Sequence, residues 1–166
     1  MQNCKIIGKK YQSGDWDISK KKLVSLEGSP NHITGRFDCS YNNYKLKSLV
    51  GGPQRVDGDY DCEINQLTDL VGCASHIGGT LFARQTNITS LVGIHKIIKS
   101  CQVIYFDADP ITQGGIGLLM IANLYEISYN TEPFKIIQSY LGTGTKGMME
   151  CSKELKAKGW AEYAKL

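Results

Sequence analysis

The sequence predicts an α/β solenoid, a short stack of about five β-coils closed by a helical cap at its C-terminal end. The first observation is a repeated phrase, Gly-x-aromatic-Asp-Cys-x-x-Asn, which runs from Gly35 to Asn42 and again from Gly58 to Asn65. The second is the period. The apolar anchors of successive copies are 21, 23, 21 and 23 residues apart, at Trp16, Phe37, Tyr60, Leu81 and Ile104. Self-similarity at a fixed period of this length is typical of stacked repeat units.

A third observation is a leucine followed two residues later by a glycine, which recurs between the anchors at Leu26, Leu49, Leu70 and Leu91. We expect these leucines to fill the side of each coil that lies opposite the anchor strand. A single unit of this size cannot bury its apolar edge alone, so the units must stack.

Within each unit, the residues around the anchor are expected to form a short strand. Side chains alternate along a strand, so Phe37 and Cys39 would point inward and Asp38 outward. The glycine two places before each of the first four anchors suits a position where a Cβ would crowd the next coil. Asn42 and Asn65 follow their strands, and a buried amide there can donate to and accept from the backbone of adjacent coils.

The length of 166 residues fits one domain with a proper core. We expect three segments within it. Residues 1–13 would form an N-terminal cap, as a leading strand or hairpin. Residues 14–111 would form the coils, with turns or brief 3₁₀ segments between strands, and residues 112–166 the helical C-terminal cap.

The predicted cap begins with residues 118–122, where periodicity cannot distinguish a buried strand from a first helix. Thr131 and Pro133 suit the start of a helix, as its N-cap and an early position. A second helix is predicted from about Lys146 to Lys158, with Met149 facing inward and Gly159 ending it. A short amphipathic turn follows from Trp160.

Composition excludes several classes of protein. Hydrophobic residues make up 42% and charged residues 21% of the chain, as in soluble globular proteins. No apolar run approaches the ~18 residues of a membrane span, and the N-terminus lacks a signal-peptide core, so a cytoplasmic location is expected. A net charge of +3 is weak for a nucleic-acid binder. The six cysteines lack metal-ligand spacing, so we expect reduced thiols and no metal or cofactor.

The spacing apolar-x-apolar-x-x-Asn-x-apolar resembles the leucine-rich repeat. More narrowly, the phrasing from Ser25 to Asn42 and the tail from Gly114 to Leu166 are similar to leucine-rich-repeat-like proteins encoded by large tailed bacteriophages. The resemblance covers nearly the whole chain. It implies a recognition protein in the cytoplasm of the infected bacterium, where it binds, and in one interpretation inhibits, a host defence or takeover factor. Thr86 and Asp109 depart from the pattern, because asparagine is expected at both positions.

The outward column of the predicted sheet and its flank form the candidate partner-binding face. Neighbouring strands lie about 4.8 Å apart, so adjacent carboxylates repel unless water, Arg36, a basic partner or a cation relieves them. Three interpretations stay open: a face that binds a protein partner, a solvated surface copied by repeat duplication, or a metal site, against which the sparse oxygen ligands argue. The candidate partner-binding residues are Asp17, Asp38, Asp61, Glu63, Phe82, Arg84, Tyr105 and Asp107.

Phe82 and Tyr105 are expected to be exposed beside Arg84, a combination typical of interaction hot spots. The same rings could stack on a nucleotide base, or the cap could cover them. The alternative ligand site, for a nucleotide, therefore combines Arg84 and Tyr105 with Thr143 and Lys146 from the glycine-rich segment 142–147. That segment lacks the spacing of a phosphate-binding loop, which favours a plain connector between helices.

The sequence does not favour an enzyme. His32, His76 and His95 are expected in turns between strands, and no serine or cysteine has a histidine or carboxylate at a spacing typical of a catalytic site. The primary hypothesis is therefore a non-enzymatic recognition protein, and the alternative is a small-molecule or nucleotide binder that uses the last coils and the cap. The oligomeric state stays open, because both solenoid edges and exposed aromatic rings can self-associate.

Overall fold

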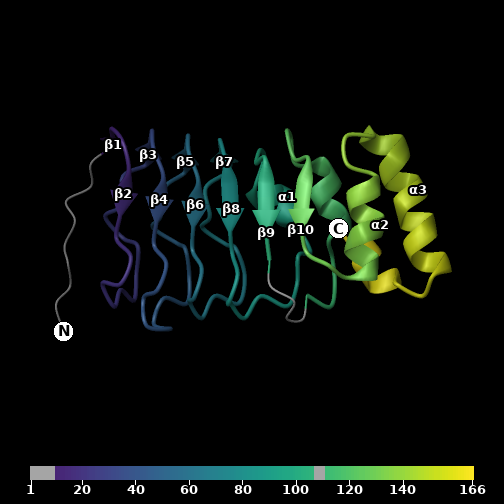
Figure 1. The fold of residues 1–166 in the computed structure, drawn as a ribbon, viewed down its shortest axis with the longest axis horizontal. Helices are drawn as coiled ribbons and strands as arrows, with labels where there is room; N and C mark the ends of the chain where they lie inside the picture. Colours follow the sequence, from purple (N-terminus) through teal and green to yellow (C-terminus); the bar gives the residue numbers. More distant parts are fainter. Residues whose placement is uncertain (1–9, 107–110) are drawn as a thin grey trace.

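The chain winds into a row of stacked coils with helices at the C-terminal end (Figure 1). This description rests on a computed structural model that describes residues 10–106 and 111–166. Each of the first four coils contributes two short strands, one to each of two parallel sheets. The predicted solenoid of about five coils with a helical C-terminal cap is confirmed.

All strand pairs in the two sheets are parallel and lie between successive coils. The smaller sheet has the order β1 (Tyr11–Gln12), β3 (His32–Ile33), β5 (Arg55–Val56) and β7 (His76–Ile77). The larger sheet has the order β2 (Trp16–Asp17), β4 (Phe37–Asp38), β6 (Tyr60–Asp61), β8 (Thr80–Phe82), β9 (Val103–Tyr105) and β10 (Glu126–Ser128).

The prediction that His32, His76 and His95 lie in turns was wrong. His32 and His76 begin strands β3 and β7, and His95 lies in the short helix α1 (Ile94–Ile97). In β3 and β7 the isoleucine that follows each histidine points into the core and is buried. Strands of two residues leave almost no alternation to detect, because one apolar residue beside one polar residue has no period.

The core is a set of apolar rows that run along the stack. Pairing places the anchors Phe37, Tyr60 and Leu81 opposite one another, and all three are fully buried. The rings of Phe37 and Tyr60 meet edge to face with centroids 4.9 Å apart. Cys39 and Cys62 occupy the neighbouring row, also fully buried, where cysteine acts as a small apolar residue. The anchors therefore form the continuous apolar spine that the period predicts.

Two buried asparagine side chains bind the coils together, as the sequence predicts. The Oδ1 atom of Asn42 accepts the backbone N–H groups of Lys21 and Leu23, at 3.1 and 3.0 Å, from the preceding coil. Its Nδ2 group donates to the carbonyl of Cys39 at 2.8 Å. Asn65 repeats the arrangement one coil later, accepting the N–H of Asn42 at 3.3 Å. Each amide thus satisfies backbone groups that the turn leaves without strand partners.

The corner that precedes these asparagines has a left-handed backbone without glycine. Lys20, Tyr41, Ile64 and Gln85 occupy equivalent places in four successive coils, with φ angles of 58°, 54°, 54° and 52°. Positive φ is unfavourable for a β-branched residue such as Ile64. The adjoining backbone bonds hold it there, since the Ile64 N–H donates to the carbonyl of Arg84 at 3.0 Å. Gly58 instead serves a close approach, because a Cβ there would lie 2.8 Å from the carbonyl of Gly35.

The larger sheet continues past residue 111, the boundary predicted for the coils. Strand β10 lies in the segment assigned to the cap and pairs in register with β9, with Ile127 opposite Ile104. The undecided segment 118–122 falls mostly in a 3₁₀ helix, Ile116–Met120. The helical cap follows β10 as α2 (Glu132–Ser139), α3 (Gly144–Ala157) and a final 3₁₀ turn, Ala161–Ala164.

Helix α3 differs from its prediction in one respect. Met149 was expected to face inward, but 57% of it is exposed. The buried face is defined by Cys151 and Leu155, which are four residues apart. At 3.6 residues per turn, a residue two places from Cys151 lies on the opposite side of the helix. No helix in residues 10–106 and 111–166 is long and apolar enough to cross a membrane.

Helix α2 closes the open edge of the larger sheet. The Oε1 atom of Gln138 accepts the backbone N–H of Ile127 at 2.6 Å, and its Nε2 group donates to the carbonyl of Tyr125 at 3.0 Å. These are groups that a further coil would otherwise pair. An edge strand left open invites pairing with another chain, and covering it removes that risk.

We expect Leu70→Ala to lower the free energy of unfolding by about 2–5 kcal/mol, because Leu70 is 3% exposed and its loss leaves a cavity between coils. Urea unfolding of the purified protein measures the change. The neighbouring Val71, which is 52% exposed, provides the control, and Val71→Ala should change stability by no more than about 0.5 kcal/mol. Equal losses in the two variants would contradict the assigned register.

We also expect Asn42→Ala to destabilise the fold, by roughly 2–4 kcal/mol, because it leaves two partly buried N–H groups and one buried carbonyl without their partner. The exposed Asn31 supplies a matched control, and Asn31→Ala should have little effect. Chemical denaturation of both variants tests the difference. If Asn42→Ala were as stable as the parent protein, the amide would not be a structural link between coils.

Candidate functional site

The outward row of the larger sheet is the candidate site. Strand pairing sets Asp17 opposite Asp38, Asp38 opposite Asp61, Asp61 opposite Phe82 and Phe82 opposite Tyr105. Figure 1 shows strands β2, β4, β6, β8 and β9 side by side in this order. Because parallel strands in register stack equivalent residues, these side chains form one continuous row across the five strands. The row is acidic at its N-terminal end and aromatic at its C-terminal end.

Arg36 neutralises part of the acidic end. One terminal nitrogen of its guanidinium forms ion pairs with Asp38, at 3.2 Å, and with Asp61. Arg36 directly precedes the anchor Phe37. Because side chains alternate along a strand and Phe37 points inward, the Arg36 side chain lies on the outer face with the aspartates. Arg36 covers Asp61, which is only 7% exposed although its side chain lies on the outer face. The sequence suggested that Arg36 could offset the repulsion between the aspartates, but it predicted that their carboxylates would be exposed to solvent.

The aspartates also shape the ends of their strands. The Oδ1 atom of Asp17 accepts the N–H of Ser19 at 2.8 Å, that of Asp38 accepts the N–H of Ser40 at 3.0 Å, and that of Asp61 accepts the N–H of Glu63 at 3.1 Å. Aspartate commonly bonds to the backbone two residues ahead in this way and ends a strand with a turn. This local role explains why aspartate recurs at a strand position where it is otherwise uncommon.

Asp61 has the most perturbed carboxyl group of the row. Burial is the largest effect and raises the pKa of Asp61 to about 6. The hydrogen bond from the Glu63 N–H lowers this pKa, whereas the negative charges of Asp38 and Glu63 raise it. The positive charge of Arg36 acts in the opposite direction. Asp17, at the exposed end of the row, behaves oppositely: its hydrogen bonds with Ser19 lower its pKa.

The aromatic end of the row is a stacked pair of rings. Phe82 and Tyr105 lie nearly parallel, with centroids 5.4 Å apart and an interplanar angle of 12°. The guanidinium of Arg84 lies 5.7 Å from the centre of the Tyr105 ring, within range of a cation–π contact. Arg84 is also paired with Glu63 across one strand step. Both rings are half-buried, so each keeps part of its surface open to solvent.

The remaining predicted residues lie elsewhere. Asp107 falls outside the described residues. Thr143 and Lys146 lie at the beginning of α3, where the Thr143 hydroxyl donates to the carbonyl of Tyr140 at 2.5 Å. Strands β9 and β10 separate β8 from the helical cap in the sheet order. Arg84 and Tyr105 are thus brought together on the sheet face, while Thr143 and Lys146 lie at the N-terminal end of α3.

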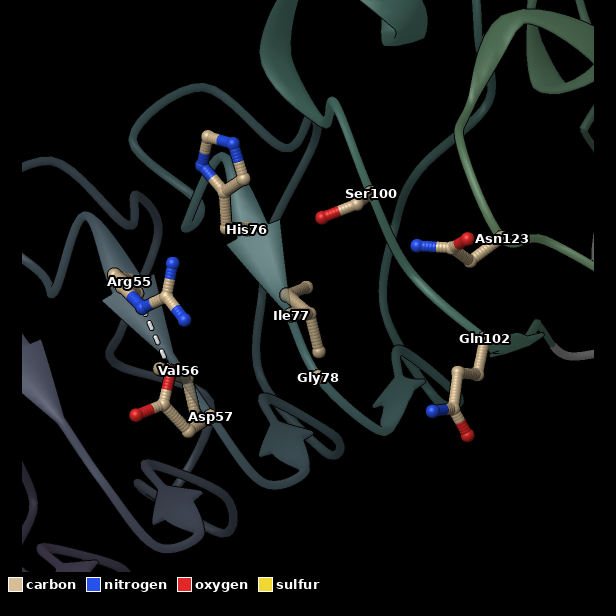
Figure 2. Close-up of a pocket in the computed structure, with 9 residues that line it drawn as sticks. All are labelled: Arg55, Val56, Asp57, His76, Ile77, Gly78, Ser100, Gln102 and Asn123. Carbon is tan, nitrogen blue, oxygen red and sulfur yellow. Dashed lines mark hydrogen bonds and ion pairs between the residues drawn. The ribbon is translucent and has the colours of Figure 1, made fainter.

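A second feature, on the smaller sheet, was not found from the sequence. A hollow of about 240 Å³ lies beside β7 and is lined by polar side chains from four successive coils, among them Arg55, His76, Ser100 and Asn123 (Figure 2). The sequence carries no specific signal for it, because the 23-residue step before Ile104 also occurs between Phe37 and Tyr60.

Comparison of the chain with protein-family models, with curated proteins and with solved structures gives no match.

We predict a pH-dependent contribution of Asp61 to stability. Its pKa of about 6 in the folded protein exceeds the ordinary value of 3.8, so the folded state holds a proton that the unfolded chain has lost. This contribution is therefore full below about pH 4 and is lost as the pH rises through 6. Between pH 4 and 7, Asp61→Asn should gain roughly 1–2 kcal/mol relative to the parent protein, a value reduced to allow for water that reaches the carboxyl.

Denaturation curves at several pH values measure this change. Asp17→Asn is the matched control from the same row, because its pKa is lowered and its contribution changes only in more acidic solution. The parent protein and Asp17→Asn should keep the same stability difference from pH 5 to 7. A constant difference for Asp61→Asn over the whole range would contradict the raised pKa.

Proposed function

We propose that the chain is a non-enzymatic recognition protein that binds another protein through the outward face of its six-stranded sheet. The observation that supports this best is the half-buried ring pair of Phe82 and Tyr105 with Arg84 beside it. Aromatic residues and arginine are enriched at the centres of protein interfaces, while lysine and acidic residues are depleted there.

The fold favours a protein partner because it holds these side chains rigidly. Each ring is attached to a strand that is hydrogen-bonded on both sides, Phe82 in β8 and Tyr105 in β9. Little side-chain entropy is then lost when a partner packs against them, which is the main advantage of a preorganised surface. A row of strands also offers a broad, nearly flat contact area, which suits a macromolecule better than a small ligand.

The ion pairs change the expected chemistry of the partner. Asp38 and Asp61 share Arg36, and Glu63 is paired with Arg84. These acids need no basic residue from outside, so we assign the main affinity to the rings and a supporting role to the paired charges. The partner would offer an apolar side chain to the ring pair and polar groups around it. The resemblance to phage-encoded proteins makes a host protein the first partner to test.

The alternative, a nucleotide-binding protein, needs Arg84 and Tyr105 to act together with Thr143 and Lys146. The contact of Arg84 with Tyr105 suits a stacked base. Thr143 and Lys146, however, lie at the N-terminal end of α3 in the helical cap, and strand β10 follows β9 at that edge of the sheet. The protein-binding proposal uses only residues that already adjoin one another, and we prefer it for that reason.

The test is affinity capture from cells with the parent protein and with the double variant Phe82→Ala/Tyr105→Ala, followed by identification and a binding measurement with the purified partner. Loss of a central aromatic contact costs about 2 kcal/mol or more, so binding should weaken by at least roughly 30-fold. The Tyr125→Ala variant is the control, because Tyr125 is an exposed ring, 60% accessible, outside the row.

Circular dichroism would establish that each variant is folded. A partner that binds the parent protein and Tyr125→Ala but not the double variant supports the proposal. A partner retained with full affinity by the folded double variant removes this face from consideration.

A further inference from the structure

The hollow on the smaller sheet arises from a difference in length between neighbouring coils. Pairing sets His76 opposite Ser100 and Thr80 opposite Val103. Three residues, 77–79, therefore connect His76 with Thr80, whereas only two, 101 and 102, connect Ser100 with Val103. We call this connection between the two sheets the corner. The next coil returns to three, because Ala122 pairs with Ser100 and Glu126 with Val103. The shorter coil leaves space at this corner.

Gly78 keeps that space open. It occupies the position of Asp57 one coil earlier, and a Cβ there would lie 2.1 Å from the Asp57 carbonyl oxygen. The floor therefore has no side chain at this point and consists of backbone together with Val56 and Ile77. Two features of the backbone therefore create the depression: the close approach at Gly78, which leaves no room for a side chain, and the connection after Ser100, which is one residue shorter than its neighbours. It is not a chance gap between surface side chains.

Hydrogen-bond donors converge on this hollow from both sides. Figure 2 shows the terminal nitrogens of Arg55 lying toward β7 on one side. On the other side, the hydroxyl of Ser100 and the side-chain amide of Asn123 are directed back toward β7. Gln102 adds a further amide at the edge. These groups come from β5 and from the two coils beyond β7, so the fold itself brings them together.

Arg55 is held in place by a neighbour that leaves its outer edge available. Its Nε–H donates to Oδ1 of Asp57 at 2.7 Å, while Oδ2 of Asp57 lies 2.8 Å from Nε2 of His32. Asp57 itself lines the hollow, and each of its two carboxylate oxygens is paired, one with Arg55 and the other with His32. The two terminal amino groups of Arg55 can then form the paired contacts with which guanidinium groups recognise carboxylates and phosphates.

His76 completes the rim. Its Nδ1 atom lies 2.9 Å from the hydroxyl of Ser75, which fixes the orientation of the ring. The hydroxyl of Ser75 also lies within hydrogen-bond distance of the carbonyl of Gln54, at 3.3 Å, which ties His76 to the preceding coil. The imidazole ring of His76 therefore forms one side of the hollow, next to Arg55.

We propose that this hollow binds a small oxyanion, the phosphate or carboxylate group of a small ligand, between Arg55 on one side and Ser100 and Asn123 on the other. The volume of about 240 Å³ equals that of about eight water molecules, below the usual range for enclosing a drug-sized ligand. It therefore fits an anionic head group with a small body. The hollow opens on the smaller sheet, so this site is independent of the protein-binding face.

The proposal is tested by nuclear magnetic resonance titration of the isotope-labelled protein with sodium phosphate and, separately, sodium acetate. Sodium chloride at matched ionic strength serves as the reference. We expect saturable shifts of the backbone amides of His76, Ser100 and Gln102, with a Kd on the order of millimolar. The anion that binds more tightly identifies the head group, phosphate or carboxylate.

Three variants connect the binding to these residues. Arg55→Gln removes the charge and should weaken binding roughly tenfold or more, because a charge-assisted hydrogen bond is lost. Asn123 has a φ of 65°, so Asn123→Gly removes the amide while keeping the left-handed backbone, and should weaken binding several-fold. Lys153→Gln, at an exposed cation of helix α3, should leave the affinity within about twofold of the parent value.

The absence of any saturable shift from phosphate or acetate beyond that of chloride would overturn the proposal. So would binding that a folded Arg55→Gln variant retains at full strength, since that result would place the anion elsewhere. Neither outcome affects the protein-binding proposal, whose residues lie on the larger sheet.

Discussion

Hydrogen bonding between the backbones of successive coils is the constraint from which the other features follow. The N–H of Trp16 donates to the carbonyl of Arg36 at 2.8 Å, and the same pattern is repeated along the stack, as in the bond from Phe37 to Asp59 at 2.9 Å. Parallel pairing in register then forces equivalent residues of successive coils into contact. An apolar residue at one position gives a buried row. An aspartate at one position gives a row of like charges, which requires a cation such as Arg36.

The same constraint separates the molecule into two surfaces with different properties. On the larger sheet the register is regular through the acidic and aromatic row, so side chains pack tightly against their equivalents. On the smaller sheet the regular pairing ends after β7, where the next coil crosses the corner with one residue fewer. Regular stacking gives a flat face, and a local mismatch gives a hollow. A broad flat contact and a small concave one can therefore coexist on one short solenoid.

The sequence was sufficient to predict the features that depend on period. The buried rows of Phe37, Tyr60 and Leu81 and the amide links of Asn42 and Asn65 follow from spacing, because residues one period apart must meet in a stack. The left-handed corner at Ile64 could not be anticipated, since glycine or asparagine is expected at positive φ. Strand β10 was missed because Glu126 and Ser128, on either side of its buried Ile127, do not match the repeated phrase.

The candidate site was predictable to the same degree. Period identified which side chains share the outward row, including Asp61 and Tyr105. It could not show that Arg36 lies across Asp61 and buries it, because that depends on the path of a long flexible side chain. The hollow beside β7 was beyond prediction for a different reason. It depends on a one-residue difference between two corners, and such a difference is visible only once the strands are paired.

The side-chain amide of Gln138 meets strand β10 as the backbone of another coil would. The Gln138 amide therefore recognises main-chain groups that every turn of the stack presents. Such a terminator sets no fixed number of turns. Duplication of a complete turn ahead of it would widen the sheet by about 4.8 Å and leave the seal intact. A chain of this kind can evolve a larger surface without redesigning its end.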